Sequence, residues 1–148
     1  MQRVVFSKTL KPEKSYLKDE TKIWFKYSNE NFDSAMVLLK SGLFNPCLQN
    51  VQQAVEKALK AIIVENNIHL KKTHDILELN TVLKRKHIKI DLSNEECDFI
   101  NSIYLPSKYP IGSVIPDYDP DETICRKAIS IALNVNKSVA EYLKLLDT

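Results

Sequence analysis

Glycine is scarce in this chain of 148 residues, which contains only Gly42 and Gly112. Glycine-rich loops that hold phosphate groups need several residues without a Cβ, because the backbone must come close to the phosphate. The sequence therefore excludes both the dinucleotide-binding type and the P-loop type of nucleotide site. A nucleotide, if one is bound, has to be held by side chains.

The chain also lacks a large charge excess and a cysteine framework. Its formal net charge is +2, which is below the basic balance of a dedicated nucleic-acid module. The three cysteines, Cys47, Cys97 and Cys125, are odd in number and far apart, and no C-x-x-C or H-x-x-x-H pair occurs. We therefore expect structural thiols, no metal or other cofactor, and a cytoplasmic location, because paired cysteines are typical of oxidising compartments.

Long apolar runs are absent too, since none approaches the roughly 18 residues of a membrane span. We therefore expect no membrane segment. Residues 1–20 are polar and rich in lysine, and we expect them to form a leader. Residues 21–148 are expected to form one domain, because 148 residues with 44% hydrophobic content support one sizeable core but hardly two.

Amphipathic helices dominate what is present. Apolar residues recur at steps of three and four, the pattern of a helix that buries one face. The expected helices cover about residues 21–41, 45–67, 76–87, 93–106 and 119–146. The sequence predicts an all-α fold, an antiparallel up-and-down bundle of four to five helices. In the last helix, Ala128, Val135 and Tyr142 recur at intervals of seven, which suggests a homodimer.

Local signals mark several of the helix ends. Glycine at position 42 is typical of a residue just past a helix end, and Ser93 with Glu96 forms a capping box. Asn45 before Pro46 predicts the start of the second helix, and Asp119-Pro120 predicts the start of the last one. Pro106 is expected to end the fourth helix.

The second expected helix has a polar edge, composed of Gln49, Gln52, Gln53, Glu56, Lys57 and Lys60. One interpretation is a solvated face, because Glu56 precedes Lys60 by four residues, the favourable order for a helix ion pair. The other interpretation is a working surface. The residues alone leave both open.

Two further groups of residues suggest binding chemistry. Tyr104, Lys108, Tyr109 and Tyr118 bracket the proline-rich segment "PSKYPIGSVIPDYDP", and aromatic rings beside a cation suit a nucleotide or RNA. The alternative is that the tyrosines pack against the bundle. For His74-Asp75, the aspartate either orients the imidazole or caps the third helix.

Three motifs carry a resemblance to a known family. "VQQAVEKALKAIIVENN", followed by "KKTHDILEL" and "YLPSKYP", resembles the HEPN (higher-eukaryote and prokaryote nucleotide-binding) family over about Trp24 to Leu145. The resemblance implies a helical bundle, usually a homodimer, often encoded beside a small nucleotidyltransferase in a toxin–antitoxin-like pair. Together with the proline-rich segment, it predicts a nucleotide-binding site formed by Gln53, Glu56, Lys71, Lys72, His74, Tyr104, Lys108 and Tyr109.

The chain departs from the catalytic members of that family. Many of them are metal-independent RNases in which an arginine precedes a histidine by four to six residues, and no such pair occurs here. Lys108 stands where an arginine is usual, and lysine lacks the bidentate fork. We therefore expect a non-catalytic protein that binds nucleotide or nucleic acid. The alternatives are an RNase toxin that uses His74 with Lys108 or Lys72, and a purely structural dimerisation domain.

Overall fold

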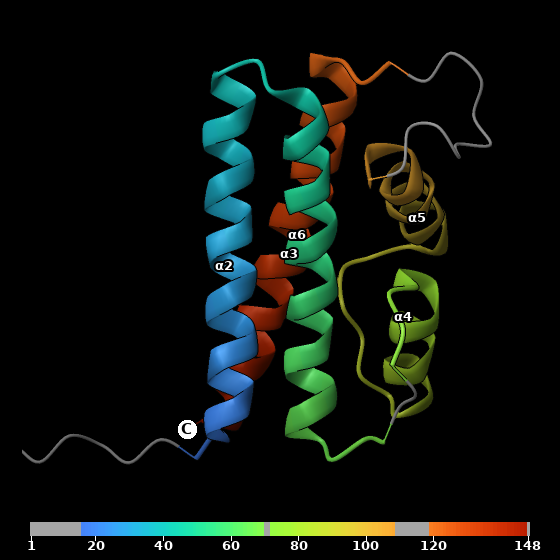
Figure 1. The fold of residues 1–148 in the computed structure, drawn as a ribbon. Coiled ribbons are helices and arrows are strands. Elements are labelled where there is room, and N and C mark those ends of the chain that lie inside the picture. Colours follow the sequence, from blue (N-terminus) through green and yellow to red (C-terminus); the bar gives the residue numbers. More distant parts are fainter. Residues whose placement is uncertain (1–15, 70–71, 109–118, 148) are drawn as a thin grey trace, which may run out of the picture.

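The computed structural model describes residues 16–69, 72–108 and 119–147, with the backbone alone for 104–108. In this part of the chain there are five helices and no strand, which confirms the predicted all-α class (Figure 1). None of these helices is long and apolar enough to cross a membrane. They are α2 (Asp19–Lys40), α3 (Phe44–Glu65), α4 (Ile76–Arg85), α5 (Asn94–Lys108) and α6 (Glu122–Leu146).

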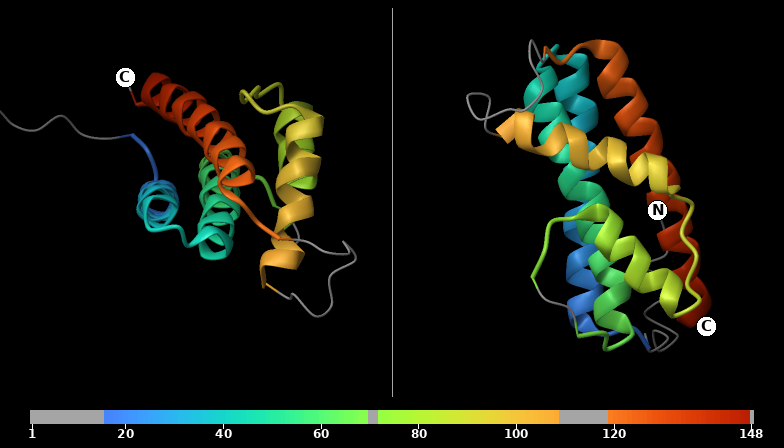
Figure 2. Two further views of the ribbon diagram at one scale, coloured as in Figure 1. Left: turned by 90° about the horizontal axis from the view of Figure 1, so that it is seen from above. Right: turned by 90° about the vertical axis from the view of Figure 1, so that its right-hand side faces the viewer.

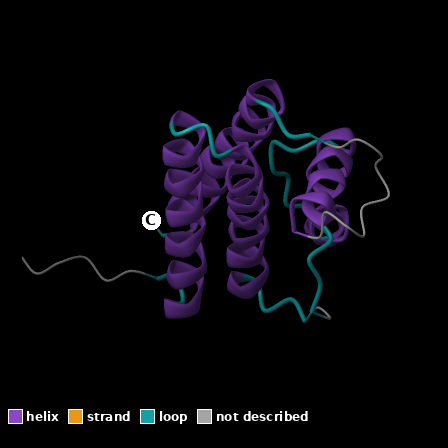
Figure 3. Cartoon of the chain, turned by 45° about the horizontal axis from the view of Figure 1, so that its top comes forward, coloured by secondary structure: helices purple, strands orange, loops and turns teal. Residues whose placement is uncertain are grey.

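The long helices α2, α3 and α6 pack together, and α4 and α5 cover the side of α3 away from α2 (Figures 1 and 2). Helix α6 runs in the same direction as α3. At their starts, the Cys125 thiol donates to the Phe44 carbonyl at 3.5 Å, and near their ends the Asn66 amide lies 3.2 Å from the Tyr142 hydroxyl. Between the end of α3 and the start of α6, the chain returns to the other end of the bundle through α4 and α5, which form the separate helical layer seen in Figure 3.

Several helix ends follow the local signals. Gly42 has a φ of 71°, a left-handed conformation that suits glycine, directly after α2. The capping box before α5 is confirmed, because the Glu96 amide donates to Ser93 Oγ at 3.0 Å and the Ser93 amide donates to Glu96 Oε1 at 2.9 Å. A left-handed glycine and two local hydrogen bonds therefore mark these boundaries.

Three details of the predicted helix ends are wrong. Helix α3 begins at Phe44, near the predicted start and with Pro46 in its first turn, where amides have no intrahelical partner, but its N-cap is Leu43 and not Asn45. The cap of α6 is Asp121, which accepts from the Ile124 amide at 2.9 Å, and Asp119 lies outside the helix. Helix α5 continues two residues past Pro106, since a proline removes one hydrogen bond and need not end a final turn.

The core is centred on α3, whose apolar side is covered by the other helices. The three cysteines are buried and free, as expected of structural thiols. Burial raises the pKa of the Cys97 thiol to about 11 and that of Cys125 to about 12. Both groups are therefore neutral thiols at physiological pH.

Candidate functional site

Two polar side chains on the α3 edge are buried. Gln52 is 0% exposed and Glu56 is 3% exposed, so the interpretation of this edge as a solvated face is wrong for both. The segment that precedes α4 lies over this part of α3 and covers them. A buried amide and a buried carboxylate need hydrogen-bond partners, because desolvation without them is unfavourable.

Glu56 is the centre of a hydrogen-bonded cluster. The Lys60 ammonium donates to Oε2 at 2.6 Å, and the Gln52 amide donates to Oε1 at 3.0 Å. His74 Nδ1 lies 3.0 Å from Oε1. Burial alone would raise the pKa of the Glu56 carboxyl, but hydrogen bonds from Lys60, Gln52 and His74 outweigh burial and hold the pKa below its ordinary value. Glu56 is therefore ionised at neutral pH.

An ionised carboxylate only accepts hydrogen bonds, so Nδ1 of His74 is the donor in its contact with Glu56. The His74 side chain is 52% exposed, which places an oriented imidazole at the surface. Asp75 caps α4 by accepting from the amides of Leu77 and Glu78 at 2.9 Å and 3.2 Å. The capping interpretation of Asp75 is confirmed, and the residue that orients His74 is Glu56.

Gln53 extends the cluster toward the surface. Its amide nitrogen donates to Gln52 Oε1 at 2.7 Å, and the Gln52 amide nitrogen lies 3.4 Å from the His74 carbonyl. The Glu56 cluster, as we call Gln52, Gln53, Glu56, Lys60 and His74, thus joins helix α3 to the segment before α4. It presents amide, ammonium and imidazole groups side by side.

The Lys60 ammonium also lies 5.5 Å from the centre of the Trp24 ring on α2. One helical turn away, Lys57 and Tyr27 repeat the arrangement at 5.9 Å. Cations over aromatic faces are attracted by the ring quadrupole. The Glu56 cluster is thereby connected to an aromatic side chain of the neighbouring helix.

A cavity of about 370 Å³, which we call the Trp24 pocket, opens beside this contact. It lies between α2, the second half of α3 and the connection that follows α3. Two lysines and one histidine line it, against one carboxylate. The lining residues are Glu20, Trp24, Lys60, Ile63, Val64, Ile68, His69, Lys72 and Thr73.

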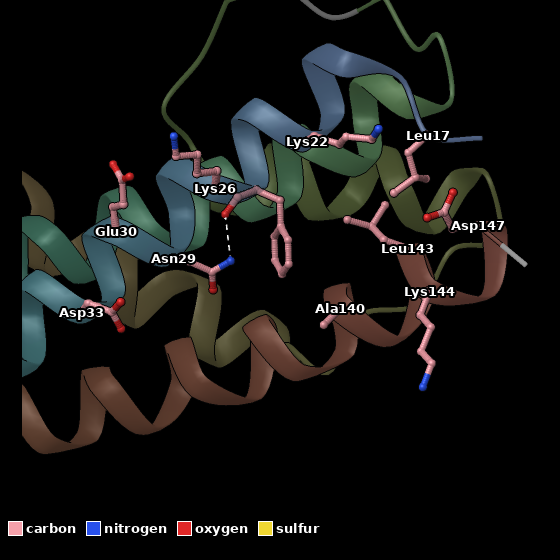
Figure 4. A pocket seen from close by; sticks show the side chains of 11 residues that line it. Leu17, Lys22, Lys26, Asn29, Glu30, Asp33, Ala140, Leu143, Lys144 and Asp147 are labelled. Carbon is pink, nitrogen blue, oxygen red and sulfur yellow. Dashed lines mark hydrogen bonds between the residues drawn. The ribbon is translucent and has the colours of Figure 1, made fainter. Parts of the chain in front are cut away.

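A larger cavity of about 680 Å³, the α2–α6 pocket, lies between helices α2 and α6 (Figure 4). Three lysines and three carboxylates line it, so its charges balance. Figure 4 shows Lys22, Lys26, Glu30 and Asp33 along α2, opposite Ala140, Leu143 and Lys144 of α6. Within the described residues, no group of three His, Cys, Asp or Glu side chains is placed to hold a metal ion.

The structure brings together part of the predicted site. Gln53, Glu56 and His74 belong to one cluster, and Lys72 lines the adjacent Trp24 pocket. Tyr104 and Lys108 are in the last turns of α5, where only the backbone is described. Lys71 and Tyr109 lie outside the described residues.

Sequence reasoning missed Trp24, Gln52 and His69 as site residues. The helical pattern places Trp24 on the apolar stripe of the first helix, and it is in fact half-buried at a pocket. Trp24 is the only tryptophan of the chain, which could have marked it as a candidate. Its contact with Lys60 could not be predicted from sequence spacing, because the two residues are on different helices.

Comparisons with known proteins agree with this architecture. The protein TT1696 from Thermus thermophilus is 20% identical and superimposes with a TM-score of 0.66, covering 84% of this chain and 98% of that one. ST0689, an archaeal HEPN homologue, is 22% identical with a TM-score of 0.59, covering 83% and 97%. The HEPN domain protein tm0613 from Thermotoga maritima is 16% identical with a TM-score of 0.53, covering 83% and 95%. These likenesses show a shared fold.

A search of curated proteins finds no match. The family model of the HEPN domain matches residues 21–142, which is most of the chain and includes the Glu56 cluster and the Trp24 pocket apart from Glu20. The chain therefore belongs to the HEPN domain family.

Proposed function

We propose that this protein binds a nucleotide or nucleic acid at the Glu56 cluster and the adjoining Trp24 pocket, without catalysis. The observation that carries the proposal is the buried, ionised Glu56, which fixes Lys60, Gln52 and His74 beside a cavity that also has Lys72 in its wall. Ammonium groups neutralise phosphate, and amides such as those of Gln53 bond a base or ribose edge. Such a site needs no glycine-rich loop.

In the proposed site, Tyr104 and Tyr109 stack on a base, Lys108 neutralises phosphate, and Lys71 extends the rim. Lys108→Ala is then expected to weaken binding by about 1 to 3 kcal/mol and to make it less dependent on salt. Tyr109→Ala is expected to lose about as much through stacking while the salt dependence stays unchanged. Calorimetric titration with mononucleotides and short RNA measures both effects, and circular dichroism checks the fold.

A control lysine must lie away from the proposed site and must not support the fold. Lys14 and Lys18 of the leader are natural choices, but Lys14 lies outside the described residues. The Lys18 ammonium donates to the Val64 carbonyl at 3.1 Å and contacts Asn67, so it supports the end of α3. Lys40, at the far end of α2 and exposed, is the better control. Equal losses from Lys40→Ala and Lys108→Ala would mean diffuse charge attraction and no defined site.

We also propose a cytoplasmic homodimer that pairs with a small nucleotidyltransferase in a toxin–antitoxin-like module. The outer face of α2 supports self-association, because Ile23, Tyr27 and Val37 are 50%, 47% and 63% exposed there. Light scattering that returned 17.0 kDa across micromolar concentrations would contradict the dimer. Failure of the chain to co-purify with a nucleotidyltransferase encoded beside it would contradict the pairing.

A second candidate function is RNA cleavage. The observation that favours it is the 3.0 Å contact between Glu56 and His74, because a carboxylate that orients an imidazole suits a general base. Lys72 or Lys108 would then stabilise the charge that develops on the phosphate. Growth arrest on expression that His74→Ala abolishes would support the enzyme. Normal growth with intact RNA, together with nucleotide binding, would support the binding protein, and failure to bind any nucleotide would leave a structural dimerisation domain.

A further inference from the structure

We infer that the Trp24 pocket holds a single nucleotide, with its base against the Trp24 ring and its phosphate on the lysine side, and that a nucleic-acid strand is not the ligand. The inference rests on the proposed function and specifies its ligand class. It places the base on Trp24 and the phosphate near Lys72, in place of the contacts with Tyr104, Tyr109 and Lys108 proposed above. It follows from the size of the cavity, the fixed aromatic ring and the distribution of charge.

Size favours a small ligand. The cavity of about 370 Å³ falls in the range of roughly 300–1,000 Å³ that small-molecule sites occupy. A strand of several nucleotides is instead held by an extended positive groove with successive stacking rings. Along α2, the next aromatic ring after Trp24 toward the surface is Tyr27, and it is not part of the pocket wall. The described wall of the pocket therefore offers one aromatic ring, which can stack on one base.

The aromatic wall is held in place from two sides. Trp24 Nε1 lies 3.4 Å from Glu20 Oε2, and the Lys60 ammonium lies over the ring at 5.5 Å. Lys60 is in turn fixed by the buried Glu56 at 2.6 Å, so its ammonium has little side-chain freedom left to lose on binding. Ile63, Val64 and Ile68 add the apolar surface that a stacked base needs.

Charge sets the orientation of the ligand. Lys60 already compensates Glu56, so Lys72, which is exposed in the pocket wall, is the main contact for a phosphate, with His69 near it in sequence. Glu20 is the single carboxylate among the lining residues and lies next to the Trp24 indole. It repels phosphate and accepts from a base amine, which places the base at Trp24 and the phosphate toward Lys72.

Trp24 is the only tryptophan of the chain, so its fluorescence reports directly on this pocket. We expect AMP and GMP to quench the Trp24 fluorescence to saturation. Adenosine, which lacks the phosphate, should bind at least about tenfold more weakly. Single-stranded oligonucleotides of the same bases should bind no more tightly than the mononucleotides. Lys72→Ala should weaken the quenching titration by about tenfold, whereas Lys40→Ala should leave it unchanged.

A second variant series covers the aromatic wall. Trp24→Leu should abolish mononucleotide binding measured by calorimetry, whereas Tyr27→Leu, the matched ring one turn away, should not. Circular dichroism must show the same helical signal for both. Because the main titration uses the unaltered chain, the inference stays testable even if Trp24→Leu fails to fold.

The outcomes separate the two claims. Calorimetric binding of RNA or a nucleotide with unchanged Trp24 fluorescence would overturn this inference and leave the proposed function standing. Oligonucleotides that bind far more tightly than AMP and GMP would also overturn it. Absence of any nucleotide or nucleic-acid binding would overturn both. If Lys72→Ala and Lys40→Ala weakened nucleotide binding equally, the attraction would be diffuse, and the claim of a defined pocket would be overturned.

Discussion

The two cavities of this protein share a helix and differ in almost everything else. Trp24 and Phe25 are neighbours in sequence, yet Trp24 lines the Trp24 pocket and Phe25 lines the α2–α6 pocket, because successive residues of a helix point about 100° apart. The α2–α6 pocket is the larger, about 680 Å³ against about 370 Å³. Its three lysines are matched by three carboxylates, whereas the smaller cavity has Lys60 and Lys72 against the single carboxylate Glu20, with Lys60 paired to Glu56 behind the wall.

The polar groups of the two cavities also have different uses. In the α2–α6 pocket, Asn29 accepts from the Asn136 amide at 2.5 Å, and Asp147 accepts from the Tyr16 amide at 2.6 Å. These contacts join α6 to α2 and to the residues before it. Beside the Trp24 pocket, the buried Glu56 fixes side chains that reach the surface. Volume alone is therefore a poor guide to function here, and preorganised charge is the better one.

The largest effect is expected from removing the centre of the Glu56 cluster. Glu56→Ala leaves a buried amide and a largely buried ammonium without their partner, which should lower the free energy of unfolding by about 3–5 kcal/mol. Glu30→Ala, at an exposed carboxylate of the α2–α6 pocket, should change it by no more than about 0.5 kcal/mol. Urea denaturation followed by circular dichroism measures both, and similar losses would show that Glu56 has no special structural role.

Filling each cavity gives a smaller effect that tests function. Val64→Phe adds a ring to the wall of the Trp24 pocket and should weaken AMP binding by about tenfold or more, because the ring occupies space that the ligand needs. Excess volume in a well-packed core costs roughly 1–3 kcal/mol, and a tenfold loss of binding is of this size. Ala140→Phe adds the same ring to the α2–α6 pocket and should leave AMP binding unchanged. The Trp24 titration is available in both variants. If Ala140→Phe lost AMP binding and Val64→Phe kept it, the ligand would occupy the α2–α6 pocket, which would contradict the proposed site.

The smallest expected effect is the pH dependence of stability. The pKa of Glu56 is lowered in the folded protein, so its ionised form stabilises the fold above its ordinary pKa of 4.5, and this contribution is lost as the pH falls below that value. Glu56→Gln cannot titrate. The difference in free energy of unfolding between the unaltered chain and Glu56→Gln should therefore be constant near neutral pH and shrink in acid. A difference that grew in acid would contradict the lowered pKa.

The sequence was most informative where local hydrogen bonds decide the structure. The periodicity predicted five helices, and the box of Ser93 and Glu96 was readable because both partners lie within one turn. The sequence could not show which aspartate caps α6, since Asp119 and Asp121 have the same side chain and are two residues apart. The helical period placed Gln52 on the polar edge and could not show that the segment before α4 covers it.

The site was partly readable for the same reason. Glu56 and Lys60 are four residues apart on one helix, so their pairing follows from spacing. His74 is 18 residues from Glu56, and Trp24 is on another helix, so their contacts depend on how α2, α3 and the connection before α4 pack. The HEPN-like motifs led to Glu56 and His74. Nothing in them pointed to Trp24.

The most direct test of the central claim is a map of amide and methyl chemical-shift changes by NMR as AMP is added to the isotope-labelled, unaltered chain. We expect saturable changes confined to the Trp24 pocket and its neighbours in the Glu56 cluster, including Lys60, Ile63 and Ile68. The residues of the α2–α6 pocket, such as Ala140 and Leu143, should stay unchanged. Changes centred on Ala140 and Leu143, or spread evenly over surface lysines, would contradict this claim.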